Sequence, residues 1–147
     1  IRFKESKVRI MGRNARGVRG MRLVEGQRII SMLIPESREA QILTASARGY
    51  GKRTPVGEYR VQGRGGKGII TMKTGDKTGA VVGALTVKDA DEIMLITAGG
   101  QMVRTFVKDI REAGRNTMGV KLVNLDANDK LQAIAPVISD STGDEAA

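Results

Sequence analysis

Cysteine and histidine are both absent from this sequence of 147 residues, and aromatic residues make up only 3% of it. Without them there is no disulfide, no thiolate nucleophile, no imidazole for acid–base catalysis and no zinc site of the usual Cys/His kind. The scarcity of aromatic rings also leaves little on which the bases of single-stranded nucleic acid could stack. Any hydrophobic core must come from Ile, Val, Leu, Met and Ala, which dominate the 40% hydrophobic fraction.

Long apolar runs are absent as well. No run approaches the roughly 18 residues that span a bilayer, and no signal peptide opens the sequence. We therefore expect a cytoplasmic protein without a membrane partner. The acidic group Asp89, Asp91 and Glu92 lies between two apolar runs, where a polar turn accounts for it. We expect no metal ion, no cofactor and no catalytic residue in this chain.

Positive charge is abundant: Lys and Arg number 25 against 16 Asp and Glu, which gives a net charge of +9. The distribution is uneven, with +13 over residues 1–125 and −4 over residues 126–147. Such a balance favours a polyanionic partner, with nucleic acid first and an acidic membrane surface second.

The sequence repeats itself with a period of 51 residues. The shared element is Gly-Arg-x-x-x-Gly followed by Val or Ile, and it begins at Gly12, Gly63 and Gly114. Each unit reads as four short strands separated by glycine turns, without sustained helical periodicity. The expected strands in the three units are 28–35, 41–47, 52–56, 68–73, 80–87, 92–98, 103–107, 119–125 and 131–137.

Four strands per unit predict an all-β fold of propeller blades, although a β-sandwich or another β repeat would give the same periodicity. The units are 1–40, 41–91 and 92–138, and an acidic tail covers 139–147. In the repeat register Ile1 corresponds to Lys52, so the first unit lacks its first strand. Three blades do not close a ring, so we expect unpaired strand edges at 1–8 and in the final unit, completed by preceding residues or by a second chain.

Repetition places equivalent cations at equivalent positions on successive blades. An arc of guanidinium groups suits the phosphate backbone of bent duplex DNA, because each Arg can grip phosphate with a forked set of donors. The candidate DNA-binding residues are Arg2, Arg9, Arg13, Arg16, Arg19, Lys52, Arg53, Arg60, Arg64, Lys67, Arg104, Arg111 and Arg115. Within this set, we expect Arg64 and Lys67 to lie on an exposed turn and to contribute more than their neighbours.

Glycines flank these cations and can serve either turn geometry or close approach of DNA. We assign a structural turn role to Gly12, Gly17, Gly63, Gly65, Gly66, Gly68, Gly114 and Gly119. The stretch 63–68 also fits the dinucleotide pattern G-x-G-x-x-G, but a strand-like run follows it where that pattern requires a helix. Nucleotide binding is therefore disfavoured.

Three segments carry a specific resemblance. They are Met11-Gly12-Arg13-Asn14 with Gly17-Val18-Arg19-Gly20, then 49–54 with 58–60 and 62–68, and finally 114–120. Together they resemble blades of the C-terminal domain of the DNA gyrase A subunit, over residues 1–138. Topoisomerase IV, whose related domain has degenerate motifs, is the nearest alternative family.

The resemblance implies a β-pinwheel, a propeller-like ring of usually six blades that exchange strands with their neighbours. It implies a non-catalytic domain that wraps duplex DNA and so supports ATP-dependent negative supercoiling by the holoenzyme. The implied partners are double-stranded DNA, the gyrase B subunit and the rest of the gyrase A chain, with ATP and Mg²⁺ bound only in other parts. Tyr50 and Tyr59 are then structural, since the cleaving tyrosine belongs to another domain.

The sequence departs from the family at one motif. The family's basic box reads Gln-Arg-Arg-Gly-Gly-Lys-Gly, whereas the stretch 62–68 has Gly63 in place of the first Arg. These units therefore resemble later blades of the ring. The acidic tail, with Asp140, Asp144 and Glu145, is expected to compete with DNA for the basic rim. A blade-type module that binds an acidic protein remains the alternative from a different functional class.

Overall fold

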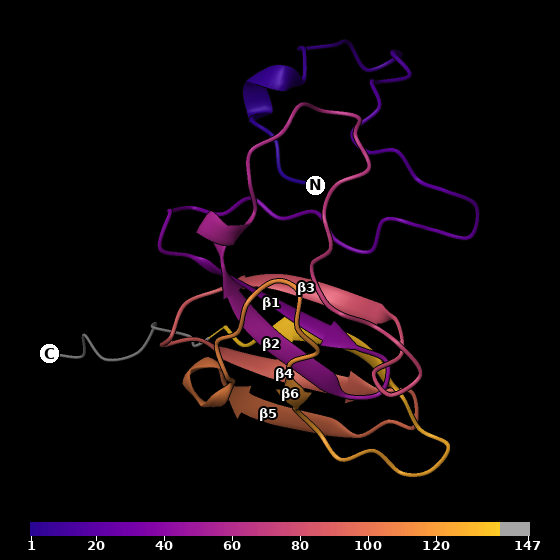
Figure 1. The fold of residues 1–147 in the computed structure, drawn as a ribbon, viewed down its shortest axis with the longest axis vertical. Helices are drawn as coiled ribbons and strands as arrows, with labels where there is room; N and C mark the ends of the chain where they lie inside the picture. Colours follow the sequence, from indigo (N-terminus) through magenta and orange to yellow (C-terminus); the bar gives the residue numbers. More distant parts are fainter. Residues whose placement is uncertain (139–147) are drawn as a thin grey trace, which may run out of the picture.

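The computed structural model describes residues 1–138, so the acidic tail lies outside the described residues. Seven strands and three short 3₁₀ turns make up its regular structure (Figure 1). None of the helices within 1–138 has the length and apolar character needed to cross a membrane. The strands are β1 (Gln41–Ser46), β2 (Tyr50–Pro55), β3 (Val81–Val87), β4 (Glu92–Thr97), β5 (Met102–Phe106), β6 (Val120–Lys121) and β7 (Leu131–Pro136).

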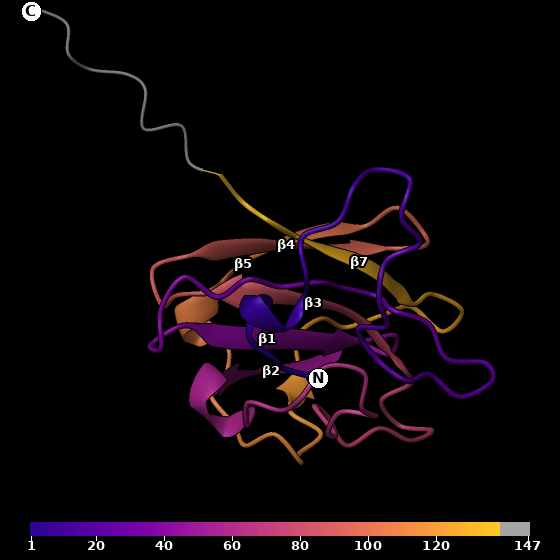
Figure 2. The same ribbon diagram turned by 90° about the horizontal axis from the view of Figure 1, so that it is seen from above.

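Two antiparallel sheets hold these strands. The first has the order β3-β1-β2-β6 and the second has the order β5-β4-β7. Figure 2 shows the second sheet stacked over the first, with β3 and β7 in contact. In β3, a Cβ on Gly83 would lie 2.9 Å from Cγ1 of Ile134, so the absence of a side chain lets the two sheets approach here.

The core lies between the two sheets. The strand β4 alternates half-buried and fully buried residues, as expected for a strand with one face on a core. Leu43 of β1, Ile93 and Leu95 of β4 and Leu131 of β7 are all buried in one cluster. Burying side chains of this size stabilises the fold by about 1.5–3 kcal/mol each. Aliphatic residues therefore supply the core, as the composition predicts.

The repeat of 51 residues persists in space. The three 3₁₀ turns η1 (Glu5–Lys7), η2 (Val56–Glu58) and η3 (Val107–Asp109) begin at positions 51 residues apart. Two isolated parallel bridges, Arg2 with Val61 and Arg53 with Glu112, keep the same spacing. Each bridge joins the second strand of one unit to the segment that follows the 3₁₀ turn of the next.

Strand exchange between units is visible at β6. This strand belongs to the third unit, yet it pairs with β2 of the second unit, with Tyr50 opposite Lys121 and Gly51 opposite Val120. Gly119 precedes the pair with φ of +75°, and a Cβ there would lie 2.2 Å from the carbonyl oxygen of Gly51. Only glycine allows this approach, so the last glycine of the motif fixes one unit against another.

Some expected strands are missing or shortened. The segments 28–35 and 68–73 are not strands, and 119–125 keeps only β6. The repeat register explains the first two. In the second unit β3 pairs with β1, and the counterpart of β1 that would pair with 28–35 falls before Ile1. Likewise β6 pairs with Tyr50 and Gly51, and the counterparts of these two residues that would pair with 69–70 fall before Ile1. A strand needs a partner for its backbone hydrogen bonds, and this sequence supplies none at those positions.

The same register accounts for apolar side chains left in solvent in the first unit. Ile10, Met32 and Ile34 are 102%, 85% and 78% exposed. Ser31, between them in sequence, accepts a hydrogen bond at Oγ from the backbone N–H of Ala84 in β3. The segment 28–35 thus lies along β3 without forming a ladder. Within 1–8, where an unpaired edge is expected, Arg2 forms a bridge with Val61.

A substitution of Gly119 tests the importance of the exchanged strand. We expect Gly119→Ala to lower the free energy of unfolding by about 2 kcal/mol or more, because it combines an unfavourable φ with a backbone clash. Gly12→Ala is the matched control, since a Cβ at Gly12 meets nothing within 4 Å and its φ is not positive. Equal stability of both variants in urea titrations would contradict this role.

Candidate nucleic-acid interface

The three Gly-Arg loops form a connected series. The backbone N–H of Gly65 donates to Gly20 O at 2.9 Å, and that of Arg22 donates to Gly66 O at 2.9 Å. The second bond repeats one unit later, where the N–H of Lys73 donates to Thr117 O at 2.9 Å. The second and third basic loops are therefore each held by the unit before them.

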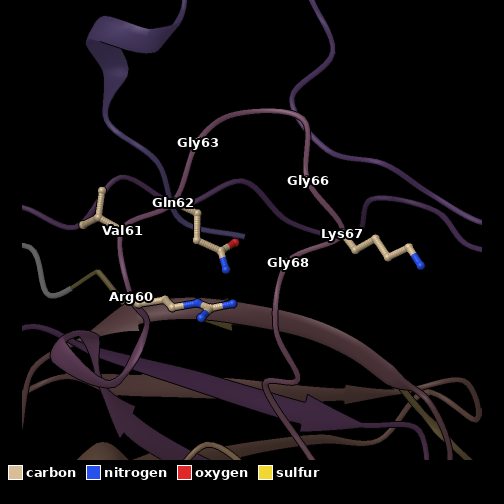
Figure 3. Close-up of a pocket in the computed structure, with 7 residues that line it drawn as sticks. All are labelled: Arg60, Val61, Gln62, Gly63, Gly66, Lys67 and Gly68. Carbon is tan, nitrogen blue, oxygen red and sulfur yellow. The ribbon is translucent and has the colours of Figure 1, made fainter.

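The loop 60–68 surrounds an open hollow of about 560 Å³ (Figure 3). Arg60 and Gln62 point into it. Figure 3 draws the Gln62 amide nitrogen toward Arg60; with the amide oxygen and nitrogen exchanged, the oxygen accepts from Nε at 2.8 Å and from Nη2 at 3.0 Å. Lys67 extends away from the hollow into solvent. Gly65 and Gly68 have φ of +87° and +81°, a conformation that favours glycine, so the loop backbone depends on them.

The motif arginines Arg64 and Arg115 are half-buried, and their side chains form hydrogen bonds that connect neighbouring loops. Arg64 donates from Nε to Lys7 O at 3.0 Å and from Nη1 to Arg19 O at 2.6 Å. Arg115 repeats the second bond, from Nη1 to Ile70 O at 2.5 Å. Because these donors are directed at carbonyls, the expected arc of free guanidinium groups is reduced at these two positions.

Lys52 is fully buried, with its ammonium group directed at the third loop. Its Nζ donates to Gly114 O at 2.5 Å, to Arg115 O at 2.5 Å and to Thr117 Oγ1 at 3.1 Å. Burial lowers the pKa of Lys52 to about 8, partly offset by the Glu58 carboxylate and reinforced by the Arg115 charge. In this conformation Lys52 positions a basic loop and does not reach solvent.

Arg2, Arg53 and Arg104 occupy one register position in the three units. Arg2 donates from Nη1 to Tyr59 O at 2.9 Å, and Arg53 donates from Nε to Ile110 O at 2.6 Å. Arg53 also forms an ion pair with Asp89, and Arg104 forms one with Glu92. Arg2 and Arg53 are thus hydrogen-bonded to the next unit. The side chain of Arg104 is 59% exposed.

The other candidates have free charges. Within residues 1–138 the ion pairs are Arg53–Asp89, Lys88–Glu36 and Arg104–Glu92, so none involves these cations. They are exposed and lie on or beside the linked loops, where they can neutralise phosphates. They are Arg9, Arg13, Arg16, Arg19, Arg60, Lys67 and Arg111. The described residues hold no cluster of three or more acidic side chains suited to a metal ion.

Two further lysines, which are not repeated between units, lie near Tyr50 and outside the Gly-Arg loops. Lys77 and Lys121 place their Nζ atoms 5.6 Å and 5.9 Å from the centre of the Tyr50 ring. The counterparts of Lys77 in the other units are Gly26 and Asn128. A search for repeated cations cannot find a group that occurs in one unit only.

Repeated units that build antiparallel blades and lend a strand to their neighbour define a propeller-like β-pinwheel protein with a basic interface. A family model described as "DNA gyrase C-terminal domain, beta-propeller" matches residues 1–36, 40–88 and 91–138. The chain belongs to this family. The predicted all-β, propeller-like fold and the predicted family are both confirmed.

Curated relatives agree with the family. The DNA gyrase A subunit of Pseudomonas aeruginosa is 55% identical over 145 residues, covering 99% of this chain and 16% of that protein. The DNA gyrase A subunit of Escherichia coli is 51% identical over 123 residues, covering 84% of this chain and 14% of that protein. The chain thus spans about a sixth of the length of these relatives and corresponds to their C-terminal domain, which is not the catalytic one.

Solved structures share the architecture. A structure of a DNA gyrase A C-terminal domain superposes with a TM-score of 0.84 at 32% identity, covering 92% of this chain and 46% of that one. The C-terminal domain of a DNA topoisomerase IV gives a TM-score of 0.85 at 29% identity, covering 92% and 42%. Fold alone does not separate the two enzymes, whereas the sequence identities favour gyrase.

A comparison of two neighbours in one loop tests the role of the motif arginines. We expect Arg64→Ala to lower the free energy of unfolding by about 1–2 kcal/mol, because it removes two charge-assisted hydrogen bonds on a partly exposed site. Lys67→Ala removes the same charge but no hydrogen bond or ion pair within residues 1–138, and should stay within about 0.5 kcal/mol of the parent. Indistinguishable urea midpoints for the two variants would contradict the assignment.

The lowered pKa of Lys52 has a consequence for stability. Between about pH 8 and 10.5, unfolded Lys52 keeps a proton that folded Lys52 has lost, so the free energy of unfolding rises with pH in this window. The slope for one proton is at most about 1.4 kcal/mol per pH unit. Below pH 8 both states are protonated and this dependence vanishes.

Lys52→Met provides the reference for that measurement. Other titrating groups contribute equally to both proteins, so they cancel in the difference between the two free energies of unfolding. As pH rises from 8 to 10.5, the free energy of unfolding of the parent protein should increase relative to that of Lys52→Met. A constant or opposite trend in denaturant titrations would show that the lysine keeps its proton throughout.

Proposed function

We propose that this chain binds duplex DNA through the phosphate backbone and wraps it, as the C-terminal domain of a DNA gyrase A subunit. The observation that carries the proposal is the set of exposed, unpaired cations on loops that are hydrogen-bonded in series. Phosphate contacts on a series of fixed loops follow a bent backbone without reading its bases.

Charge and shape both support backbone recognition. The free cations include Arg13, Arg16 and Arg19 from the first unit, Arg60 and Lys67 from the second, and Arg111 from the third. No carboxylate within residues 1–138 pairs with any of them. Aromatic side chains that could stack on unpaired bases are scarce, which favours duplex over single-stranded DNA.

The proposal extends to the assembly in which the chain works. Wrapping would present a crossing of defined hand to the cleavage machinery, and the holoenzyme would convert it into negative supercoils using ATP. The partners are then the gyrase B subunit and the rest of the gyrase A chain, in the cytoplasm. This chain would contribute no catalytic residue and hold no cofactor, and ATP and Mg²⁺ would act elsewhere in the enzyme. Identity of 55% to a gyrase A protein supports gyrase over topoisomerase IV.

Salt dependence of DNA binding tests the proposal. If about five phosphates are neutralised, log K should fall against log salt with a slope of roughly −4 to −5, with little preference for sequence. The measurement is fluorescence anisotropy of a labelled mixed-sequence duplex over a salt series. A nearly flat slope would overturn backbone binding.

A competition assay separates DNA binding from the protein-interaction alternative. Unlabelled duplex and polyglutamate are compared at equal concentrations of negative charge. Unlabelled duplex should displace the labelled duplex at a much lower concentration than polyglutamate. Preferential displacement by polyglutamate would instead indicate a module for acidic proteins.

A further inference from the structure

Tyr50, Lys77 and Lys121 form a cationic cluster that lies outside the Gly-Arg loops. The Nζ atoms of the two lysines lie 5.6 Å and 5.9 Å from the centre of the same tyrosine ring. Their ammonium groups are therefore less than about 12 Å apart, close to the screening length at moderate salt. No carboxylate in the described part of the chain forms an ion pair with either lysine.

The position of Lys121 is fixed by the exchanged strand. Lys121 of β6 lies directly opposite Tyr50 of β2, so the two side chains share one face of the sheet. The backbone N–H of Leu122 donates to Gly49 O at 2.7 Å and holds the pair in register. The cluster thus forms only when the third unit lends its strand to the second.

The position of Lys77 is fixed by a tight turn. Thr78 is fully buried, and its Oγ1 accepts from Gly75 N at 3.0 Å. Gly79 N donates to Gly75 O at 2.9 Å, which closes the turn. Arg48 N then donates to Thr78 O at 2.9 Å and joins this turn to the turn between β1 and β2. Lys77 is therefore held near Tyr50 by backbone contacts.

The cluster is continuous with the third basic loop. Lys121 follows Gly119, the last glycine of that loop, by two residues, and Lys73 N donates to Thr117 O within it. Lys121 thus follows directly on the end of that loop. Among residues 1–138 no carboxylate is paired with either lysine, so both positive charges remain available to an anion.

We propose that Lys77 and Lys121, held over the Tyr50 ring, form a contact with the phosphate backbone of duplex DNA that is separate from the repeated loops and occurs once in this chain. The next unit has Gln101 and Asn128 at the counterparts of Tyr50 and Lys77. The ring and Lys77 therefore come from the second unit alone, and Lys121 comes from the third. This inference rests on the proposed function and adds a site to it.

The test compares two doubly substituted proteins of equal charge, each checked by circular dichroism for native folding. Lys77→Ala with Lys121→Ala removes the cluster. Lys108→Ala with Lys130→Ala removes two exposed lysines elsewhere, one of them also lying over an aromatic ring, Phe106, at 5.2 Å. The cluster variant should bind the labelled duplex roughly tenfold more weakly at low salt and flatten the salt slope by about two units. The control variant should show smaller changes in both the affinity for the labelled duplex and the salt slope.

A second pair of variants tests whether the ring orients the lysines. Tyr50→Phe keeps the face of the ring and should keep the affinity, whereas Tyr50→Leu keeps both charges and should weaken DNA binding. Equal affinities of the two variants would overturn the role of the ring.

The outcomes distinguish this inference from the proposed function. Loss of salt-dependent DNA binding in the parent protein itself would overturn both. Normal binding by the parent, with equal affinities and slopes for the two double variants, would overturn the cluster alone. Weaker binding of polyglutamate but unchanged binding of duplex by the cluster variant would also overturn it, since the site would then serve an acidic protein.

Discussion

Backbone pairing between consecutive units is the interaction on which the rest of this structure depends. The short strand β6 completes the sheet of the unit before it, and Gly119 approaches Gly51 so closely that no other residue fits. This contact sets where the third basic loop ends. It also brings Lys121 opposite Tyr50 and places the loop where the buried ammonium group of Lys52 donates to Gly114 O. At 69–70, the counterpart of β6, no strand forms and Ile70 is 59% exposed.

Cations in this chain divide into two groups by what their donors reach. Arg2, Lys52, Arg53, Arg64 and Arg115 direct theirs at carbonyl oxygens of neighbouring units, and so replace regular secondary structure in the loops. The exposed cations carry no such contact and keep their charge available. The cations bonded to carbonyl oxygens thus hold the loops in place, and the exposed cations on these loops remain available to a partner. Net charge alone therefore overstates how much of it faces a partner.

The sequence predicts the β class, the period of the repeat and the identity of the family, because short apolar runs, glycine turns and recurring motifs can all be recognised without the fold. It does not predict which strands form, since the existence of β6 depends on a partner strand in the preceding unit. Lys52 shows a second reason. Its type and spacing match an exposed phosphate ligand, and only the fold shows that three acceptors surround its ammonium group. Charge type is visible in sequence, whereas burial is a property of the assembled units.

The hydrogen bonds that link one basic loop to the next have a mechanical consequence. A duplex is a stiff rod, and bending 20–30 base pairs by 40–90° stores on the order of 1–6 kcal/mol, which acts as a recoil pulling outward on whatever holds it. In this chain a pull on the loop at Lys67 is transmitted through Gly65 and Arg64 to the first unit, and a pull on the loop at Arg115 through its guanidinium group to Ile70. The load of a bent duplex is thus carried by several units at once, and no single turn has to withstand it alone.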